Sequence, residues 1–338
     1  MPVAPFQKIA VLGAGSWGTA LAVWLAGRGE QVTLWGHDPA HIATLRATAA
    51  NAKYLPGVAL PPGIVPVYDL QAVTGSDLVV FVTPSRAIRE VAGVLAKVPL
   101  APGAVLLSCT KGIEFGSGLR MSQILAGALP GAEVAVFSGP SHAEEVARHS
   151  PTALVIGGEQ TGAVARLQTL FNARALRTYT SDDLPGIELG GALKNIFAVA
   201  AGVSDGLGFG DNAKAALVTR SLAELIRLGT RLGGRRETFQ GLSGIGDLMV
   251  TCFSRHSRNR RVGELLGRGE SLAAVTASMS MVAEGVPTTR SAYERARTLG
   301  VETPVIDEVH AILYEGRAPG EALRNLFGRE PRPETDEG

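Results

Sequence analysis

A glycine-rich turn near the N-terminus constrains the fold of this chain more than any other feature. Residues 13–18 read GAGSWG, follow a short apolar run at 8–12 and lead into the apolar helical pattern TALAVWLAGRG. Between a strand and a helix, Gly13 allows a tight turn, Gly15 lets a pyrophosphate approach the backbone, and Gly18 permits close packing of helix on strand. The turn therefore predicts a dinucleotide-binding unit, with amide groups of the helix N-terminus facing the phosphates. An ordinary glycine-rich turn is the alternative.

The pattern that follows the turn predicts an α/β fold. Short β-rich runs alternate with helical segments, at residues 8–12, 31–35, 77–83, 104–109 and 134–138. Such alternation predicts a doubly wound, mostly parallel sheet of the Rossmann type. Two further runs, 153–156 and 176–180, extend the same sheet in a direction that the sequence does not reveal.

The second half of the chain changes to long helical stretches, at residues 187–202, 212–228, 292–299 and 306–314. A length of 338 residues also exceeds one typical core and suits two domains. We expect a dinucleotide-binding domain at 1–183, an all-helical domain for substrate binding and dimerisation at 184–328, and a polar, flexible tail at 329–338.

Composition limits the classes of partner. A formal net charge of +1 argues against broad attraction to nucleic acid or anionic membrane. Cys109 and Cys252 are the only cysteines, and the six histidines are scattered, so we expect no disulfide framework and no metal site. The N-terminus has no signal-peptide pattern, and no apolar run approaches the roughly 20 residues of a membrane span. We expect a soluble, cytoplasmic protein.

The end of the second expected strand bears on the choice between NADH and NADPH. An acid about 20 residues after the glycines binds the ribose 2′-hydroxyl and disfavours a 2′-phosphate. His37 stands where this acid is expected and Asp38 follows one place later. NADPH could be accepted or preferred, or Asp38 could be a simple helix cap. The cofactor preference stays open.

The later strand ends carry small and polar residues at the edge where doubly wound folds bind ligands. Lys111 lies in TKG, and Gly139 and Ser141 lie in FSGPSHAEE. Ser141 and Glu144 also form an S-x-x-E capping box, so Ser141 could start a helix. The alternative for Lys111 is a solvated loop cation.

Lys194, in GALKNIFAVAAG, is the first candidate for proton transfer. Hydride reduction of a ketone needs a proton donor for the developing alkoxide, and the reverse reaction needs the same group as a base. A lysine early in an apolar helix, near the expected boundary between domains, suits this purpose because an apolar setting favours the neutral amine. The alternative is an ammonium paired with Glu188 or Asp205.

Two segments further along offer partners for a phosphorylated substrate. Asp247, in GIGDL, could bind hydroxyl groups, hold a lysine, or merely begin a helix. Residues 257–261 read SRNRR and contain Ser257, Arg258 and Asn259, a dense set of phosphate donors. A basic, solvated helix face is the alternative.

Taken together, GAGSWGTALA, SCTKGIE, SGPSHAEEVA, LGGALKN, GDNAKAALVTR, GIGDL, SRNRRVG and VAEGVPT resemble the bacterial NAD(P)-dependent glycerol-3-phosphate dehydrogenase family over residues 8–318. The resemblance implies a helical domain of the 6-phosphogluconate dehydrogenase-like type and a homodimer. It also implies reversible reduction of dihydroxyacetone phosphate to sn-glycerol 3-phosphate with NADH or NADPH, which supplies glycerophospholipid synthesis.

The resemblance also assigns residues. Lys194 would be the proton donor and acceptor, with Lys111 and Asp247 as further catalytic groups. Substrate contacts would come from Lys111, Gly139, Ser141, Lys194, Asp247, Ser257, Arg258 and Asn259. Beside the glycines at 13, 15 and 18, dinucleotide contacts would come from Ser16, Trp17, His37, Lys111, Ala143, Arg258, Val282 and Glu284.

Two other functions remain open. A related β-hydroxyacid dehydrogenase, such as one acting on 6-phosphogluconate, shares a Rossmann unit and a KN helix. A non-catalytic NADPH sensor would need the dinucleotide site but no proton donor. Lys194 and the 257–261 cluster favour the enzyme acting on a triose phosphate.

Overall fold

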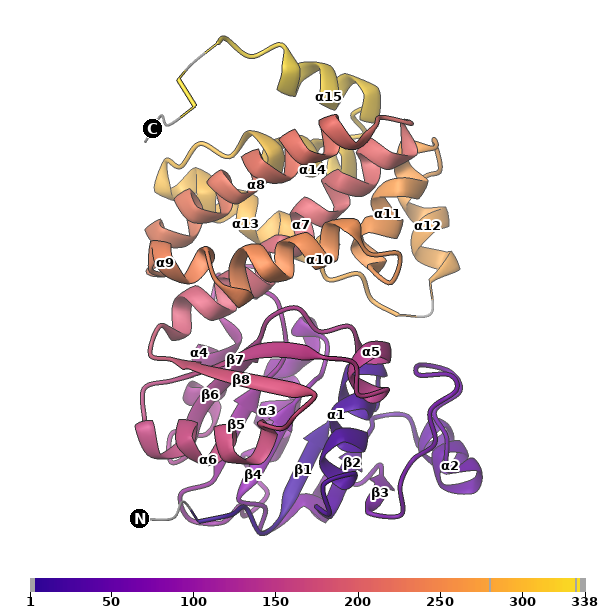
Figure 1. Ribbon diagram of the computed structural model, residues 1–338, viewed down its shortest axis with the longest axis vertical. Helices are drawn as coiled ribbons and strands as arrows, with labels where there is room; N and C mark the ends of the chain where they lie inside the picture. The colour runs from indigo at the N-terminus through magenta and orange to yellow at the C-terminus, as the bar shows by residue number, and fades with distance from the viewer. Residues whose placement is uncertain (1–3, 280, 332, 335–338) are drawn as a thin grey trace. The chain divides into compact units, whose positions relative to one another are not determined.

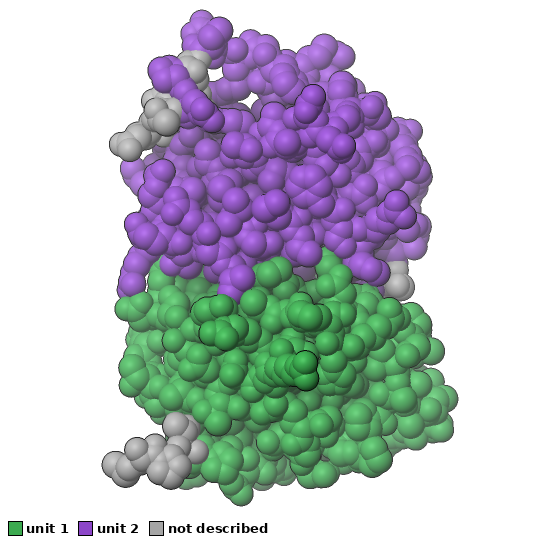
Figure 2. Space-filling view, viewed as in Figure 1, with its two compact units in different colours: residues 1–111, 119–187 green, residues 112–118, 188–338 purple. Residues whose placement is uncertain are grey.

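The computed structural model describes residues 4–279, 281–331 and 333–334. The chain forms two compact units, shown in separate colours in Figure 2. The first contains residues 1–111 and 119–187, and the second contains residues 112–118 and 188–338. Part of the tail expected to be flexible, residues 332 and 335–338, lies outside the described residues.

The first unit is built on one eight-stranded sheet in the order β3-β2-β1-β4-β5-β6-β7-β8 (Figure 1). All neighbours are parallel except β6 and β7, which are antiparallel. The predicted mostly parallel, doubly wound sheet is confirmed, and both later runs extend it. The strands are β1 (Ile9–Leu12), β2 (Val32–Trp35), β3 (Ile64–Val67), β4 (Leu78–Phe81), β5 (Val105–Ser108), β6 (Glu133–Ser138), β7 (Thr152–Gly158) and β8 (Leu176–Ser181).

Strand β3 was not among the strands predicted from the sequence. It forms an edge of the sheet and contains Pro66, which lacks the N–H that a central strand must donate. Proline is tolerated at an edge, where one side of the strand has no partner. The same proline hides the strand pattern from a reading of the sequence.

Helices cover both faces of the sheet, because its central strands are apolar on both sides. In β1, Ile9 and Val11 belong to the apolar cluster that includes Leu21 of α1. Ala10 and Leu12 belong to a second cluster with α3 and α4. The helices of this unit are α1 (Ser16–Ala26), α2 (Pro39–Thr48), η1 (Leu70–Val73), η2 (Ser85–Ala87), α3 (Ile88–Leu95), α4 (Met121–Ala128), α5 (Ala143–Ala147) and α6 (Thr161–Phe171).

The second unit is helical and is organised around α7 (Leu184–Gly206). Glycines let α11 approach α7 closely: a Cβ on Gly202 would lie 1.9 Å from the carbonyl oxygen of Arg260, and one on Gly263 would lie 1.9 Å from that of Val199. The other elements are α8 (Asp211–Arg231), α9 (Arg236–Phe239), η3 (Leu242–Gly246), α10 (Asp247–Phe253), α11 (Arg258–Gly267), α12 (Leu272–Ser278), α13 (Gly285–Leu299), α14 (Pro304–Tyr314) and α15 (Pro319–Phe327).

The expectation that no apolar run approaches the length of a membrane span is wrong for α7, the one helix in the described part of the chain that is long and apolar enough to cross a membrane. Its entire apolar window is buried inside the protein. Ile196 and Phe197 are fully buried among residues of the surrounding helices. The apolar character of α7 is therefore accounted for by packing in the core of the second unit.

The short segment 112–118 belongs to the second unit although the chain on either side of it belongs to the first. It is attached to α13, where the hydroxyl of Ser291 donates to the carbonyl oxygen of Ile113 over 3.1 Å. No pattern in the sequence indicates that this segment leaves the first unit. The assignment of dinucleotide binding to 1–183 and of substrate binding to 184–328 remains a prediction about function.

Candidate active site

The glycine-rich turn has the shape that a pyrophosphate needs. Gly13 has a φ of +127°, and a Cβ there would lie 2.6 Å from the carbonyl oxygen of Val82. A Cβ on Gly18 would lie 1.9 Å from the carbonyl oxygen of Gly13, so α1 approaches the turn as only glycine allows. A Cβ on Gly15, by contrast, would meet nothing within 4 Å. The backbone at Gly15 is thus open to a ligand, at the N-terminus of α1.

Asn51 holds this turn from a distant part of the chain. Its buried side-chain amide donates to the carbonyl oxygen of Ala14 over 3.0 Å and to the hydroxyl of Thr19 over 2.7 Å. No local pattern in the sequence marks Asn51, which follows the glycines by more than thirty residues.

The end of β2 carries no acid in the position that would bind a ribose. His37 is exposed there. The carboxylate of Asp38 accepts the backbone N–H groups of Ala40 over 3.0 Å and His41 over 3.3 Å, and so caps α2. These N–H donors lower the pKa of Asp38. The helix-cap interpretation of Asp38 is therefore confirmed.

Three predicted residues of the first unit lie together at the ends of β5 and β6. The Lys111 ammonium donates to the carbonyl oxygen of Gly139 over 3.1 Å, and the Ser141 hydroxyl donates to the same oxygen over 3.0 Å. The capping interpretation of Ser141 is wrong: α5 begins at Ala143, its cap residue is His142, and no side chain caps it. The hydroxyl of Ser141 turns instead toward Gly139.

In the second unit, Lys194 lies in a buried polar network. Its Nζ is 2.6 Å from Oδ1 of Asp247 and 2.6 Å from the hydroxyl oxygen of Thr251. Asp247 and Thr251 stand four residues apart on α10, so both face the same side of that helix. Asp247 therefore holds a lysine, one of the three alternatives given for it. Thr251 was missed, although its i+4 spacing from Asp247 could have indicated it.

Glycine again allows the close approach behind this network. A Cβ on Gly190 of α7 would lie 2.4 Å from the carbonyl oxygen of Ser243, and one on Gly244 would lie 1.9 Å from that of Phe239. The turn η3 therefore packs directly on α7 just before α10 begins. This packing brings Asp247 to Lys194 across 53 residues of sequence.

The alternative in which Lys194 pairs with Asp205 is wrong. Asp205 instead accepts hydrogen bonds from Nζ of Lys214 over 2.8 Å and from Nε of Arg260 over 2.6 Å. Arg260, one arginine of the 257–261 cluster, is therefore paired with Asp205 within the protein. It does not serve as a free phosphate donor.

Ser257 and Asn259 of the 257–261 cluster also have separate partners within the protein. Ser257 caps α11 by accepting the N–H of Arg260 over 3.2 Å. Asn259 is buried, donates to Oδ1 of Asn195 over 2.8 Å and accepts the N–H of Gly285 over 2.8 Å. Its side chain thereby joins α7 to the start of α13.

Arg258 is the exposed member of this cluster that lies beside other predicted residues. Its Nη1 donates to the carbonyl oxygen of Val282 over 2.9 Å, which links it to the segment expected to contact the dinucleotide. Glu284, two residues after Val282, is the cap residue of α13. The predicted site residues thus form two groups, one in each unit.

Comparison with known proteins decides the family. Sequence models of the N-terminal and C-terminal parts of NAD-dependent glycerol-3-phosphate dehydrogenase match residues 8–164 and 183–324. The chain belongs to the NAD-dependent glycerol-3-phosphate dehydrogenase family. Glycerol-3-phosphate dehydrogenase (NAD(P)+) of Chlorobium luteolum is 47% identical over 334 residues, which cover 98% of this chain and 100% of that protein. The same enzyme of Geobacillus kaustophilus is 49% identical over 337 residues, with 98% and 97% covered.

Solved structures of related proteins have the same fold as this member of the glycerol-3-phosphate dehydrogenase family. A crystal structure of glycerol-3-phosphate dehydrogenase from Coxiella burnetii matches with a TM-score of 0.93 and 38% identity, covering 96% of this chain and 99% of that one. A ketopantoate reductase from Ralstonia eutropha shares the fold, with a TM-score of 0.61, 20% identity, and 94% and 100% covered.

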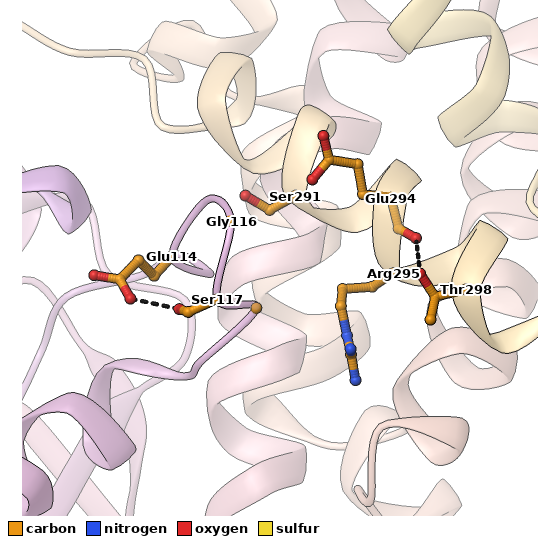
Figure 3. A pocket seen from close by; sticks show the side chains of 8 residues that line it. Glu114, Gly116, Ser117, Ser291, Glu294, Arg295 and Thr298 are labelled. Carbon is orange, nitrogen blue, oxygen red and sulfur yellow. Dashed lines mark hydrogen bonds between the residues drawn. The ribbon is translucent and has the colours of Figure 1, made fainter.

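This family member also has a cavity of about 110 Å³ between the 112–118 segment and α13 (Figure 3). Ser117 donates to the carboxylate of Glu114, and Thr298 donates to the carbonyl oxygen of Glu294 over 2.9 Å. None of the predicted site residues lines this cavity. The residues that line it are Glu114, Gly116, Ser117, Gly118, Ser291, Glu294, Arg295 and Thr298. Among the described residues, no group of three or more His, Cys, Asp or Glu could hold a metal ion.

Proposed function

We propose that this chain catalyses the reversible, NAD(P)H-dependent reduction of dihydroxyacetone phosphate to sn-glycerol 3-phosphate. The observation that carries the proposal is the buried Lys194–Asp247–Thr251 network in a member of this family. The glycine turn at 13–18, open at Gly15, supports binding of the dinucleotide. Relatives at 47–49% identity bear the name of this activity.

Lys194 is the proton donor in this proposal. A dinucleotide bound at the glycine turn would supply a hydride to the carbonyl carbon of the substrate, whose oxygen would gain negative charge as the double bond opens. The Lys194 ammonium gives a proton to that oxygen and becomes a neutral amine, so the product is an alcohol. In the reverse direction the amine takes the proton back.

Asp247 and Thr251 orient the lysine for this transfer. Two partners, each 2.6 Å from Nζ, fix the direction in which the ammonium of Lys194 points. The carboxylate of Asp247 also stabilises the ammonium inside a buried site. The geometry therefore supports a proton donor with a fixed direction.

Arg258 is the proposed anchor for the substrate phosphate, since its guanidinium is exposed and can bind a phosphate in a bidentate manner. Ser257 and Asn259 support it at the start of α11, and Lys111, Gly139 and Ser141 contribute from the first unit. The proposed dinucleotide contacts are the glycines at 13, 15 and 18 with Ser16, Trp17, His37, Lys111, Ala143, Arg258, Val282 and Glu284.

We further propose that the enzyme works in the cytoplasm as a homodimer and supplies the glycerol backbone of phospholipids. These features follow from the resemblance to the bacterial family. Sedimentation of the purified protein tests the dimer.

The test of the reaction is the initial rate of nicotinamide oxidation with dihydroxyacetone phosphate, measured with NADH and NADPH in parallel. Lys97→Ala is the matched control for Lys194→Ala, because Lys97 is an exposed lysine that is not among the proposed contacts. Turnover that survives Lys97→Ala and is lost in Lys194→Ala supports the proposal. Turnover of 6-phosphogluconate alone would indicate the related hydroxyacid enzyme, and dinucleotide binding without any turnover would indicate a sensor.

A further inference from the structure

The cavity between the 112–118 segment and α13 is polar throughout. Every residue found in its lining is charged, carries a hydroxyl group or is a glycine. Its volume of about 110 Å³ is far more than the roughly 10–15 Å³ that one water needs. An apolar cavity stays dry, whereas a polar cavity of this size takes water or a polar ligand. The cavity therefore suits a small polar molecule.

Arg295 brings a positive charge to this cavity. Its Nε is buried and has no hydrogen-bond partner. In Figure 3 its guanidinium extends away from the carboxylates of Glu114 and Glu294. The carboxylate of Glu294 instead lies 3.7 Å from Nε of Arg290. A buried charged donor without an acceptor is unfavourable, and an oxyanion in the cavity would supply the acceptor because a guanidinium can hold such an anion through two parallel hydrogen bonds.

A glycine makes room for this arginine. Gly118 has a φ of +67°, and a Cβ there would lie 2.8 Å from Cδ of Arg295. A residue with a side chain at this position would therefore displace the arginine. The turn that ends the 112–118 segment is thus shaped to accept the stem of Arg295 beside it.

The hydroxyl groups of the lining specify the ligand further. Ser291 donates to the carbonyl oxygen of Ile113 over 3.1 Å, and Thr298 donates to that of Glu294 over 2.9 Å. Ser117 donates to a carboxylate of its own segment. A hydroxyl group has one proton, so in this arrangement these oxygens can only accept a hydrogen bond from a ligand. A well-matched ligand therefore has negative oxygens for the guanidinium and also an O–H group of its own.

We propose that Arg295 binds hydrogen phosphate in this cavity and that the bound anion ties the 112–118 segment to α13. Hydrogen phosphate offers charged oxygens to the guanidinium and a proton to the serine and threonine oxygens, whereas sulfate offers only the charged oxygens. The segment directly follows Lys111, so the anion would restrain the chain next to a proposed substrate contact. The binding inference goes beyond the proposed function and does not depend on the reaction.

Calorimetry with inorganic phosphate, and with sulfate at the same ionic strength, tests the proposal at pH 7. The measurement uses Arg258→Ala saturated with dinucleotide, so that neither the proposed substrate anchor nor the glycine turn binds phosphate. We expect one phosphate for each chain, bound at least about tenfold more tightly than sulfate. Adding Arg295→Met should weaken phosphate binding at least about tenfold. Adding Arg324→Met, which removes an exposed arginine of α15, should leave phosphate binding unchanged.

Thermal unfolding distinguishes a ligand-binding arginine from one that supports the fold. In phosphate-free buffer, Arg295→Met should unfold at a temperature at least as high as the unaltered protein, because the lost guanidinium has a buried donor without a partner. A lower unfolding temperature would indicate that Arg295 supports the fold, and would overturn the proposal.

Hydrogen exchange tests the tie between the segment and α13. Phosphate should slow the exchange of backbone amides in residues 112–118 of the unaltered protein, but not of Arg295→Met. The proposal would be overturned by unchanged exchange, by equal affinity for phosphate and sulfate, or by phosphate binding that survives Arg295→Met.

Discussion

Replacing Asp247 with asparagine removes the charge that faces the Lys194 ammonium while nearly preserving the shape of the side chain. Nζ and Oδ1 lie 2.6 Å apart, and the two side chains are only 8% and 1% exposed. Removing one partner of a buried ion pair costs about 3–5 kcal/mol, because the other charge is left without compensation.

The lysine can limit this cost by releasing its proton. Lysine in an unfolded chain has a pKa of about 10.4, so neutralising it at pH 7 costs about 4.6 kcal/mol, at about 1.36 kcal/mol for each pH unit. We therefore expect Asp247→Asn to lower the free energy of unfolding by about 4 kcal/mol at pH 7. Because the unfolded variant then binds one more proton than the folded variant, the deficit shrinks by about 1.36 kcal/mol for each pH unit, to about 1.3 kcal/mol at pH 9.

Denaturant unfolding followed by far-ultraviolet circular dichroism at pH 7, 8 and 9 measures this deficit. The matched control is Glu270→Gln, which removes an exposed carboxylate from the same unit and should change stability by less than about 0.5 kcal/mol. A deficit below about 1 kcal/mol at pH 7, or one that is independent of pH, would refute the reasoning that Asp247 neutralises a buried ammonium.

Four further outcomes are expected. Lys194→Ala should lower kcat at least about a hundredfold with little change in dinucleotide affinity, and Arg258→Ala should mainly raise the KM for dihydroxyacetone phosphate; steady-state kinetics check both. Gly15→Ala should leave stability unchanged but weaken dinucleotide binding in calorimetry. Gly18→Ala should lower both the stability and the dinucleotide affinity, because a Cβ on Gly18, unlike one on Gly15, would overlap the backbone. Burial raises the pKa of Glu224 to about 8, so the folded chain holds a proton that the unfolded chain releases, and stability should fall as the pH rises from 4.5 to about 8. Glu224→Gln should remove that slope in denaturant titrations.

Several assignments could be made from the sequence because their causes are local. The strand, turn and helix around residues 13–18 are marked by apolar runs and by glycines whose backbone freedom matters within a few residues. Lys194 could be singled out because one lysine in an apolar helix is unusual. Strand β3 was lost, since Pro66 at an edge of the sheet conceals the pattern.

Other features depend on contacts that no local pattern encodes. Residues 257–261 look like one phosphate-binding cluster in sequence, yet their side chains divide among a helix cap, an ion pair with Asp205 and a link through Asn259 to Asn195. Which direction each side chain takes depends on how closely α11 packs against α7, and Gly202 and Gly263 determine that distance. The attachment of segment 112–118 to α13 likewise depends on a contact that no local pattern encodes.

The sequence by itself thus determined the parallel sheet, the dinucleotide turn, the helical second half and the residue types needed for reduction of a phosphorylated ketone. Tertiary structure alone decided that Asp247 and Thr251 are partners of Lys194 and that Asn51 holds the glycine turn. The reason is physical: backbone sterics and hydrophobic periodicity act over a few residues, whereas ion pairs and buried amides form between elements that only packing brings together.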